Sequence, residues 1–315
     1  TVVLRGTRGS NPCLSAGKQL FGCFFVFMEG VIERLRQLNH SGTAKNYSAA
    51  LGSFKRFRNN EDIQMEAIDH ILMEDYQAYL ASLGVVPNSI SFYMRILRAV
   101  YNRAVEQELT IDRNPFRTVF TGVEKTRKRA ISISDIKRIR DLDLSLKPNL
   151  EFARNLFLFL FLCRGMSFID AAFLKKSDIQ SGILTYRRHK TNQVLHIKII
   201  KPIKELVDRY SSNDSPYLLP IITRPHCDER RQYETALRRV NKSLKTIAGM
   251  VKLPIPLTTY VSRHAWATIA KSKNIPVNVI SDALGHDSIA TTQIYLASID
   301  TSTIDRANEL IIKDL

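Results

Sequence analysis

Residues 285–298, GHDSIATTQIYLAS, place Tyr295 nine residues after His286. A phenol has a pKa of about 10, so it becomes a nucleophile only where it loses its proton in a strongly cationic site. Taken alone, Tyr295 is more typical of a packed aromatic on a helix face. Its chemistry therefore depends on the residues that accompany it.

Four other residues with charged or titratable side chains accompany the tyrosine, in the order Arg164, Lys190, Arg263 and His286. Each has an ordinary interpretation by itself. The arginines can be surface or capping residues, the lysine a solvated turn residue, and the histidine a helix-capping residue. Their order and spacing favour one shared site over separate structural roles.

Four short motifs contain Tyr295, His286, Arg263 and Lys190. LGH at 284–286 and TTQIY at 291–295 are similar to the LGH and TxxY boxes of the tyrosine recombinase (phage integrase) family of DNA breaking-and-rejoining enzymes. SRHAWAT at 262–268 is similar to the family's LRH box, and HKT at 189–191 stands at its hairpin lysine. The resemblance covers roughly residues 30–312.

The resemblance implies a role for each residue. Tyr295 would be the nucleophile, Arg263 the second catalytic arginine, and Lys190 the transfer lysine. His286 would occupy the family's histidine-or-tryptophan position. In this family the tyrosine attacks a DNA phosphodiester, which gives a 3′-phosphotyrosyl bond and a free 5′-hydroxyl. Because that bond conserves the energy of the broken one, religation needs neither ATP nor metal, and no cofactor is expected.

The residue types suit this chemistry for physical reasons. Two guanidiniums can hold the nonbridging oxygens of the phosphate in a fixed fork as charge builds on phosphorus. The ammonium of a lysine can protonate the leaving 5′-oxygen as a general acid. A carboxylate-metal centre is therefore not expected, and the sequence has no carboxylate cluster with metal-ligand spacing.

One departure from the family concerns Tyr260. The family usually has a histidine three residues before the second arginine, whereas TYVSR places Tyr260 there. A phenol can donate a hydrogen bond but is a poor base near neutral pH. If Tyr260 belongs to the site, its expected role is orientation rather than proton transfer.

The first catalytic arginine is the other departure. In LCRGMSFIDAAFLKKSDI, aligned from its SDI end, the family's arginine position falls on Ser167, and Arg164 lies three residues earlier. If the segment is helical, positions three apart share a face about 5–6 Å apart, which a long side chain can cover. The hypothesis is that Arg164 is the first catalytic arginine. The RGMSF pattern resembles a branch of the family found on mobile elements and invertible DNA segments, where the same displacement occurs.

The sequence of the N-terminal half predicts a helical bundle that would bind DNA near this site. Apolar residues recur at helical spacing in 31–38, 43–57, 66–84 and 88–107, which indicates a bundle of about four helices. Basic helix faces are usually only solvated, but two matching faces with hydroxyl groups fit a phosphate surface better. The residues predicted to bind DNA are Lys45, Ser48 and Lys55 on one helix and Ser91, Arg95 and Arg98 on another.

The C-terminal half predicts a mixed domain. The apolar period fails and Lys/Arg density rises over 114–132, which is typical of a linker. Ser132 is a candidate N-cap, residues 155–165 are apolar all round as in a buried helix, and 182–200 read as two strands around a short turn. Further helices are predicted within 204–210, 230–250, 262–273, 276–284, 288–297 and 301–312.

These patterns predict a mainly α fold in which a helical bundle precedes an α+β domain with a small antiparallel sheet. The resemblance implies that the first is a SAM-like core-binding domain and the second the catalytic domain of the DNA breaking-and-rejoining type. The predicted boundaries are an irregular lead-in at 1–29, the core DNA-binding domain at 30–122, a basic linker at 123–130 and the catalytic domain at 131–315.

Composition points to the same partner. The formal net charge is +16 and the pI about 9.8, a surplus that most often serves a polyanion such as nucleic acid. The apolar stretch 20–28 is too short to span a bilayer and is interpreted as the lead-in to a helix. The four cysteines include no CxxC pair, which indicates no zinc site, and the reducing cytoplasm of a bacterium is the expected location.

The resemblance also implies an assembly. Recombination joins two duplexes and needs four active sites, so a homotetramer on DNA is expected, with an accessory DNA-bending protein as a further candidate partner. The stretch 302–312 has apolar positions at helical spacing, and it either docks on a neighbouring protomer, as in relatives, or packs on its own chain.

Three alternatives remain open at this stage. A topoisomerase-like relaxer would use the same nucleophile without a specific partner site. A DNA-binding module whose catalysis has decayed would bind DNA without a covalent adduct. A metal-dependent nuclease or transposase would lose activity with a chelator, and the missing acidic triad argues against it.

Overall fold

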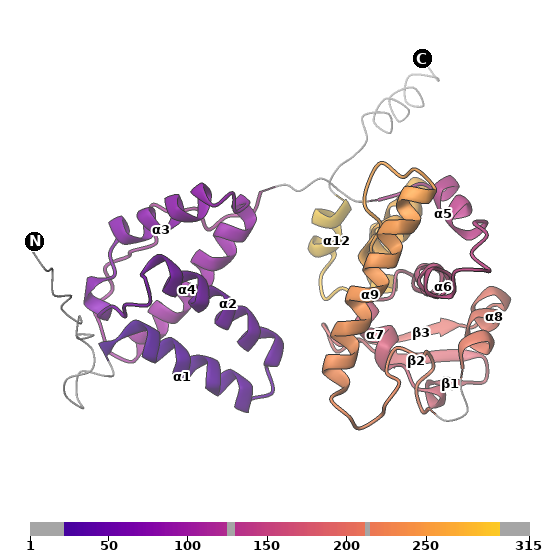
Figure 1. Ribbon diagram of the computed structural model, residues 1–315, viewed down its shortest axis with the longest axis horizontal. Coiled ribbons are helices and arrows are strands. Elements are labelled where there is room, and N and C mark those ends of the chain that lie inside the picture. Colours follow the sequence, from indigo (N-terminus) through magenta and orange to yellow (C-terminus); the bar gives the residue numbers. More distant parts are fainter. Residues whose placement is uncertain (1–21, 125–129, 212–214, 297–315) are drawn as a thin grey trace, which may run out of the picture. The chain divides into compact units, whose positions relative to one another are not determined.

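A computed structural model describes residues 22–124, 130–211 and 215–296 (Figure 1). The chain divides into two compact units, Thr1–Thr126 and Arg127–Leu315. Each unit has its own hydrophobic core. The predicted tail helix at 301–312 and the greater part of the predicted linker lie outside the described residues.

The N-terminal unit is a helical bundle. Its helices are α1 (Phe24–Gln37), α2 (Ser41–Phe57), α3 (His70–Ser82) and α4 (Pro87–Glu106), with a short 3-10 turn at Met65–Ala67. Helical periodicity places one apolar face of each helix toward the others, and the predicted bundle of about four helices is confirmed.

An aromatic cluster fills the centre of this bundle. The ring of Phe54 meets those of Phe24 and Tyr76 edge to face, with centroids 5.9 and 5.0 Å away. The Tyr76 hydroxyl lies 2.8 Å from the Ser53 hydroxyl and hydrogen-bonds to it, so its polar end has a partner inside the core.

The structure changes the predicted start of this unit. Helix α1 begins at Phe24, and Phe24, Phe25 and Met28 are buried. The irregular lead-in predicted for 1–29 is therefore wrong for residues 24–29. Within the run FFVFM, Val26 is exposed and Phe27 is half-buried, so only part of the run faces the core. Residues 1–21 lie outside the described part.

The segment after α4 folds back over the bundle. Phe116 and Val119 are buried in its core, and the Ser91 hydroxyl donates to the Gly122 carbonyl at 2.6 Å. The backbone N–H of Glu124 donates to Asn88 at 2.8 Å. The unit therefore continues through residue 124, although Lys/Arg-rich sequence suggested a linker from residue 114 onward.

The C-terminal unit is built around a buried helix. It begins with α5 (Ile133–Arg140), where Ser132 is the N-cap and forms a reciprocal capping box with Asp135, as predicted for the serine. Helix α6 (Pro148–Leu162) follows, and its part from Leu156 to Leu162 is apolar all round. The other helices are α7 (Phe168–Phe173), α8 (Lys201–Tyr210), α9 (Glu229–Met250), α10 (Thr259–Ser272), α11 (Val277–Leu284) and α12 (Ile289–Leu296).

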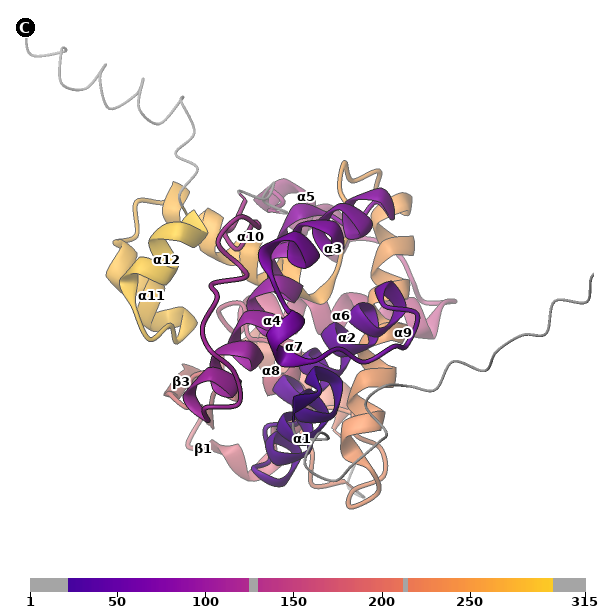
Figure 2. The same cartoon turned by 90° about the vertical axis from the view of Figure 1, so that its left-hand side faces the viewer.

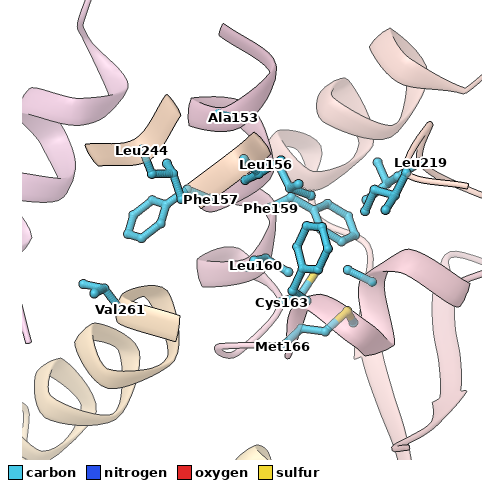
Figure 3. Packing of buried hydrophobic residues seen from close by; sticks show 14 of the residues in the cluster. Ala153, Leu156, Phe157, Phe159, Leu160, Cys163, Met166, Leu219, Leu244 and Val261 are labelled. Atoms are coloured by element: carbon cyan, nitrogen blue, oxygen red, sulfur yellow. The ribbon is translucent and has the colours of Figure 1, made fainter. Parts of the chain in front are cut away.

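Helix α6 is the central buried helix of this unit, and its apolar sequence predicts that burial. Figure 3 shows Leu156, Phe157, Phe159 and Leu160 directed to different sides of the helix, all at most 2% exposed. Each such side chain contributes about 1.5–3 kcal/mol through burial. Because α9 and α10 both pack against α6, this helix fixes where the first residues of α10 lie.

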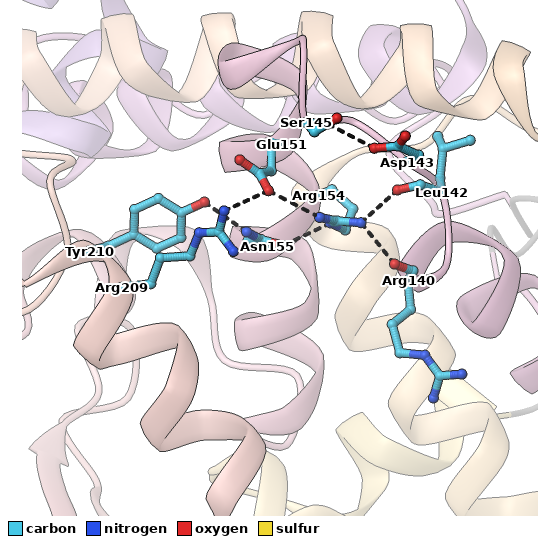
Figure 4. A network of polar contacts seen from close by, with 9 residues as sticks. All are labelled: Arg140, Leu142, Asp143, Ser145, Glu151, Arg154, Asn155, Arg209 and Tyr210. Carbon is cyan, nitrogen blue, oxygen red and sulfur yellow. Dashed lines mark hydrogen bonds and ion pairs between the residues drawn. The ribbon is translucent and has the colours of Figure 1, made fainter.

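A polar network connects the N-terminal half of α6 to α5 and α8 (Figure 4). The Arg154 guanidinium donates at 2.8 Å to the carbonyls of both Arg140 and Leu142, which satisfies acceptors at the end of α5. Glu151 pairs with Arg209 at 2.8 Å and thereby connects α6 to α8. The network therefore stabilises the packing of α5, α6 and α8, and it contains none of the residues predicted to be catalytic.

The sheet is small and antiparallel, with order β1-β2-β3. Strand β2 (Ile183–Arg187) pairs with β3 (Val194–Lys198), and Leu184 and Tyr186 turn inward while their neighbours face solvent. The predicted two strands and the predicted sheet are confirmed. A third strand, β1 (Ile179–Gln180), was not predicted because two residues show no alternation.

Candidate active site

Two of the residues predicted to carry chemistry, Arg263 and His286, meet at the turn that ends α11. Gly285 adopts the left-handed conformation there, with φ 62°. Figure 2 shows α10, α11 and α12 grouped together, and a small apolar core that includes Ala267, Ile280 and Leu296 joins them. This grouping brings three separate sequence motifs to one place.

Arg263 lies at the centre of the site. It is on the second turn of α10 and only 4% exposed. Its guanidinium donates to the Gly165 carbonyl at 2.9 Å and to the Leu284 carbonyl at 2.6 Å, and it lies 3.1 Å from Nε2 of His286. These contacts fix the plane of the guanidinium, which is what a site for a tetrahedral or trigonal oxyanion requires.

Gly165 is a glycine for steric reasons. Its φ is +69°, and a Cβ built there would stand 2.7 Å from Cα of Arg263. The backbone of the RGMSF motif therefore lies directly on α10 at the arginine. Any larger residue at 165 would push the loop off the guanidinium.

His286 is held as a neutral hydrogen-bonding group. Burial, then the positive charges of Arg263, Arg188 and Lys190, lower its pKa to about 4. Nε2 faces the Arg263 guanidinium, so it acts as acceptor, and Nδ1 lies 2.7 Å from the Thr292 hydroxyl, to which it donates. The imidazole thus connects α10 to α12.

Tyr295 lies in α12, one turn beyond Thr292. Its side chain lies outside what the structure describes. The helix itself is anchored at its middle and at its C-terminal end. Thr292 is fully buried against His286, and the Lys271 ammonium donates to the Leu296 carbonyl at 2.7 Å. The helix that carries position 295 is therefore tied to His286 through Thr292 and to α10 through Lys271.

Lys190 is exposed in the turn between β2 and β3. The preceding residue is anchored by Asp170 of α7, which accepts from the His189 backbone N–H at 2.9 Å and from its ring at 3.1 Å. Burial alone would raise the pKa of Asp170, but hydrogen bonds from His189 and Ser167 outweigh it and hold the pKa below its usual range. The carboxylate is thus charged and fixes the base of the lysine turn.

Asp170 and Arg188 are two site residues that sequence reasoning missed. Asp170 is 3% exposed and Arg188 is 6% exposed. A lone acid inside the apolar run FIDAAF was the available signal for the first, since a buried charge needs partners. Arg188 stands in the dibasic YRRHK stretch, where nothing in the sequence separates a buried arginine from a solvated one.

The structure corrects the premise for Arg164 but keeps it near the site. Helix α6 ends at Leu162, Arg164 has φ 59°, and Ser167 is the extended N-cap of α7, so the segment is a turn and not a helix. The shared-face argument is therefore wrong. Arg164 instead adjoins Gly165, the residue packed on Arg263. The Ser167 hydroxyl donates to Asp170 at 2.6 Å and caps α7.

Tyr260 lies on the first turn of α10 and is 56% exposed. Its ring meets that of His264 edge to face with centroids 4.5 Å apart. It is three residues from Arg263 and so lies on the same side of the helix. No contact of the phenol with the guanidinium is found among the described residues.

On α2, the predicted DNA-binding residues differ in their surroundings. Lys45 is exposed. The Ser48 hydroxyl donates to the Ala44 carbonyl of its own helix at 2.9 Å. Lys55 pairs with Glu29 of α1 at 2.5 Å and lies over the ring of Phe25. Ser48 and Lys55 therefore line the groove between α1 and α2 rather than a basic face.

On α4, the predicted set also divides. Arg95 and Arg98 are exposed, and Arg98 donates to the Thr121 hydroxyl at 3.3 Å. Ser91 is fully buried. The expectation that Ser91 lines an open face is wrong, because residues after α4 fold back and accept its hydrogen bond.

Two general properties concern the described residues only. They contain no group of three or more His, Cys, Asp or Glu side chains that could hold a metal ion. None of the helices seen in this part of the chain has the length and apolar character needed to cross a membrane.

Comparison with known proteins identifies the class. Residues 134–301 match the phage integrase family, and residues 23–124 match the phage integrase SAM-like domain. The chain therefore belongs to the phage integrase family. It is a tyrosine-type site-specific recombinase, a DNA breaking-and-rejoining enzyme.

Curated relatives cover most of the chain. Tyrosine recombinase XerA of Pyrococcus furiosus is 27% identical over 244 residues, which span 75% of this chain and 79% of the relative. Tyrosine recombinase XerC of Syntrophus aciditrophicus is 26% identical over 277 residues, 81% of this chain and 86% of the relative.

Solved structures show the same fold. A lambda integrase dimer bound to a COC′ core site aligns with TM-score 0.66 at 16% identity, covering 87% of this chain and 77% of that one. XerH recombinase bound to difH aligns with TM-score 0.57 at 17% identity, covering 95% and 90%. The mainly helical fold with a SAM-like domain and a small antiparallel sheet is thereby confirmed.

Proposed function

We propose that this recombinase cleaves duplex DNA by attack of Tyr295 on a phosphodiester, forms a 3′-phosphotyrosyl bond, and rejoins the strand to a 5′-hydroxyl. One observation carries the proposal. The LGH turn, the arginine of SRHAWAT, the backbone of RGMSF and helix α12 meet through hydrogen bonds of Arg263 and His286. Four motifs that are separate in the sequence thus meet at one positively charged site.

The proposed division of labour follows from each group's chemistry. The guanidiniums of Arg263 and Arg164 hold the nonbridging oxygens as charge builds on phosphorus. Lys190 protonates the leaving 5′-oxygen, because its exposed ammonium stands on a turn that can approach the strand. Neutral His286 orients Arg263 and, with it, the phosphate. Tyr260 orients the substrate from the start of α10 without taking a proton.

DNA binding by the N-terminal unit is proposed to rest on Lys45, Arg95 and Arg98, which are exposed. Ser48 and Lys55 have partners within the bundle, so we assign them a structural role beside the α1–α2 contact. The net charge of +16 supports a large phosphate-neutralising contribution from both units.

The proposed assembly is a homotetramer on two duplexes, with an accessory DNA-bending protein as a further candidate partner. Support comes from a relative by fold, since a lambda integrase tetramer has been solved bound to a Holliday junction. The stretch 302–312, proposed to dock on a neighbouring protomer, lies outside the described residues.

The proposed setting is a bacterial mobile element or invertible DNA segment, as the RGMSF motif suggests, with integration, excision or inversion as the outcome. The Tn1549 transposon integrase has a similar fold, with TM-score 0.66 at 14% identity. A bacterial cytoplasmic location stays a prediction.

A trapping assay tests the proposal. The protein is incubated in EDTA with a nicked duplex from its own element, whose short 5′ fragment diffuses away after cleavage. A DNA-linked band on a denaturing gel is expected for the wild type and for Ser167→Ala, and none for Tyr295→Phe. Tight, salt-sensitive binding without an adduct would contradict the proposal and favour a decayed binding module.

A second assay separates the recombinase from a topoisomerase-like relaxer. Two duplexes that each carry the element's site are supplied, and transfer of a labelled strand from one to the other is measured. Transfer between the two sites is expected. Relaxation of supercoils without strand transfer would favour the relaxer.

A further inference from the structure

Three consecutive carbonyls at the end of α11 each accept a hydrogen bond from a side chain of another element. The Leu284 carbonyl accepts from Arg263 at 2.6 Å. The Gly285 carbonyl accepts from Arg188 and, at 3.0 Å, from the Thr191 hydroxyl. The His286 carbonyl accepts from the Gln193 amide at 3.3 Å. Two of these three carbonyls are held by the turn between β2 and β3.

The three donors from this turn surround Lys190. Arg188 stands two residues before it, Thr191 one residue after, and Gln193 three residues after, where the second strand begins. The Arg188 guanidinium also reaches the Thr191 hydroxyl at 3.5 Å, and its backbone N–H donates to the Gln193 carbonyl at 2.8 Å. The turn that carries the lysine is thus tied both within itself and to α11.

Arg188 is an unusual residue for a purely structural role. It is 6% exposed, and no carboxylate pairs with it in the described part of the chain. Its Nε is buried without a hydrogen-bond partner. A buried cation paired only with a carbonyl and a hydroxyl is costly for stability, so its presence beside Arg263 and His286 calls for a functional reason.

The contact is also sterically tight. A Cβ built on Gly285 would lie 3.1 Å from Leu195, 3.2 Å from Cδ of Arg188 and 3.3 Å from the Gln193 side-chain oxygen. The hairpin therefore rests directly on the backbone of the glycine. Only a residue without a side chain lets the two segments approach this closely.

We infer that Arg188, with Thr191 and Gln193, is a latch that positions Lys190 for proton transfer by fastening its turn to the Gly285–His286 carbonyls. The inference rests on the proposed role of Lys190 as general acid. Arg188 is a positioning residue in this account, because its contacts are to backbone and to the turn. Its effect on the reaction passes through the lysine and not through the phosphate.

The chemistry of the leaving group gives a test that a merely structural role would not pass. With a normal substrate, the 5′-oxygen leaves as an alkoxide unless an acid protonates it. With a 5′-bridging sulfur, the leaving group is a thiol with a pKa near 8.5, which departs without an acid. Loss of the acid, or of its positioning, therefore slows cleavage of the oxygen substrate alone.

The experiment measures single-turnover cleavage of matched 5′-oxygen and 5′-sulfur duplexes at saturating protein. Arg188→Gln is expected to slow the oxygen substrate by about 10²-fold, within the range for general acid catalysis, and to cleave the sulfur substrate as the wild type does. Thr191→Val, a milder change at a half-buried turn position, is expected to show the same selectivity with a smaller loss. Lys198→Ala, at the far end of the hairpin, is the charge-matched control and should cleave both normally.

Lys190→Ala separates this inference from the proposed function. It should lose cleavage of the oxygen substrate and recover it with sulfur, and Arg188→Gln should add little to that loss because both act in one step. If Lys190→Ala is not recovered by sulfur, the general-acid assignment fails. If Lys190→Ala is recovered but both Arg188→Gln and Thr191→Val lose both substrates equally, the latch is overturned.

Discussion

The two units of this recombinase differ in what their predicted functional side chains contact. In the N-terminal bundle, Ser91 and Lys55 have partners within the unit, namely the Gly122 carbonyl and Glu29. In the C-terminal unit, Arg263 and His286 come from different elements and meet each other. In the first unit these side chains pair with structural partners, whereas in the second two residues predicted to be catalytic contact each other.

The contrast shows which sequence patterns carry functional information. A basic face at helical spacing is common to many soluble helices, and chain that folds back can cover part of it, as residues after α4 cover Ser91. Motifs drawn from several separate segments have no such general cause. Because such motifs meet in the folded chain, as Arg263 and His286 do, they are a more specific signal for a site than a basic helix face is.

The largest expected effect comes from changing the guanidinium at the centre of the site. Arg263→Lys keeps the charge but loses the fork that holds Gly165 and Leu284 carbonyls. Cleavage is expected to fall by about 10²–10³-fold or more, as when a fixed transition-state donor is lost. Adduct formation over time on a nicked duplex measures this.

The control for that variant is DNA affinity measured over a range of salt concentrations. Since the charge is kept, the salt dependence should match the wild type. Cleavage at the wild-type rate with this lysine would place the reactive centre elsewhere.

The next effect separates Arg164 from Ser167. Arg164→Ala is expected to lower the cleavage rate by about 10²-fold with little change in thermal stability, because a phosphate contact is lost. Ser167→Ala is expected to lower stability by about 1 kcal/mol, since it removes the cap of α7, while cleavage survives. Thermal unfolding and cleavage are measured side by side. Normal cleavage by Arg164→Ala with loss in Ser167→Ala would reverse the assignment.

A pH dependence follows from His286. Burial and neighbouring cations hold its pKa in the folded protein at about 4, below the value of about 6.5 expected in the unfolded chain. The unfolded chain then binds more protons between these values, so stability is present above pH 6.5 and is lost as pH falls toward 4. Urea unfolding at several pH values should show that loss in the wild type.

His286→Gln supplies the comparison for this titration, since an amide can still accept from Arg263 but does not titrate. Its stability should fall less steeply between pH 6.5 and 4 than that of the wild type. Identical slopes for the two proteins would show that the imidazole is not the group responsible.

The smallest effects test the N-terminal unit. Arg95→Ala is expected to weaken binding uniformly across DNA sequences and to reduce the salt slope by about one, as for one lost phosphate contact. Ser91→Ala is expected to leave that slope unchanged but to lower stability by about 1–3 kcal/mol, because the Gly122 carbonyl loses its partner. Salt-dependent affinity and unfolding separate the two. A change of salt slope in Ser91→Ala would mean that the serine reaches DNA.

Much of the fold could be predicted from the sequence, because the periodicity of apolar residues and the residues at helix ends determine local secondary structure. The apolar α6, the Ser132 cap and the hairpin at 182–200 follow from side-chain pattern alone. The start of α1 and the return of residues 107–124 were missed, because both depend on what a segment packs against rather than on its own period.

The site shows the same limit. Motif matching identified Arg263 and His286. Whether a charged side chain is solvated or buried with partners depends on the tertiary structure, which a local sequence pattern does not contain. Asp170 and Arg188 therefore escaped notice, although both are almost fully buried beside the lysine turn. The turn at Arg164 escaped for a related reason, since the close packing of Gly165 on α10 is visible only in the folded chain.

The central claim is that Tyr295 forms the covalent link to DNA. The trapped adduct is digested with nuclease and trypsin, and the nucleotide-bearing peptide is identified by mass spectrometry. Tyr295 is the only tyrosine of the tryptic peptide 274–306, and the exposed Tyr260 falls in the separate peptide 253–263. The account predicts the nucleotide on 274–306, and an unchanged adduct yield in Tyr260→Phe controls for the second phenol. A nucleotide on 253–263 would contradict it and make Tyr260 the nucleophile.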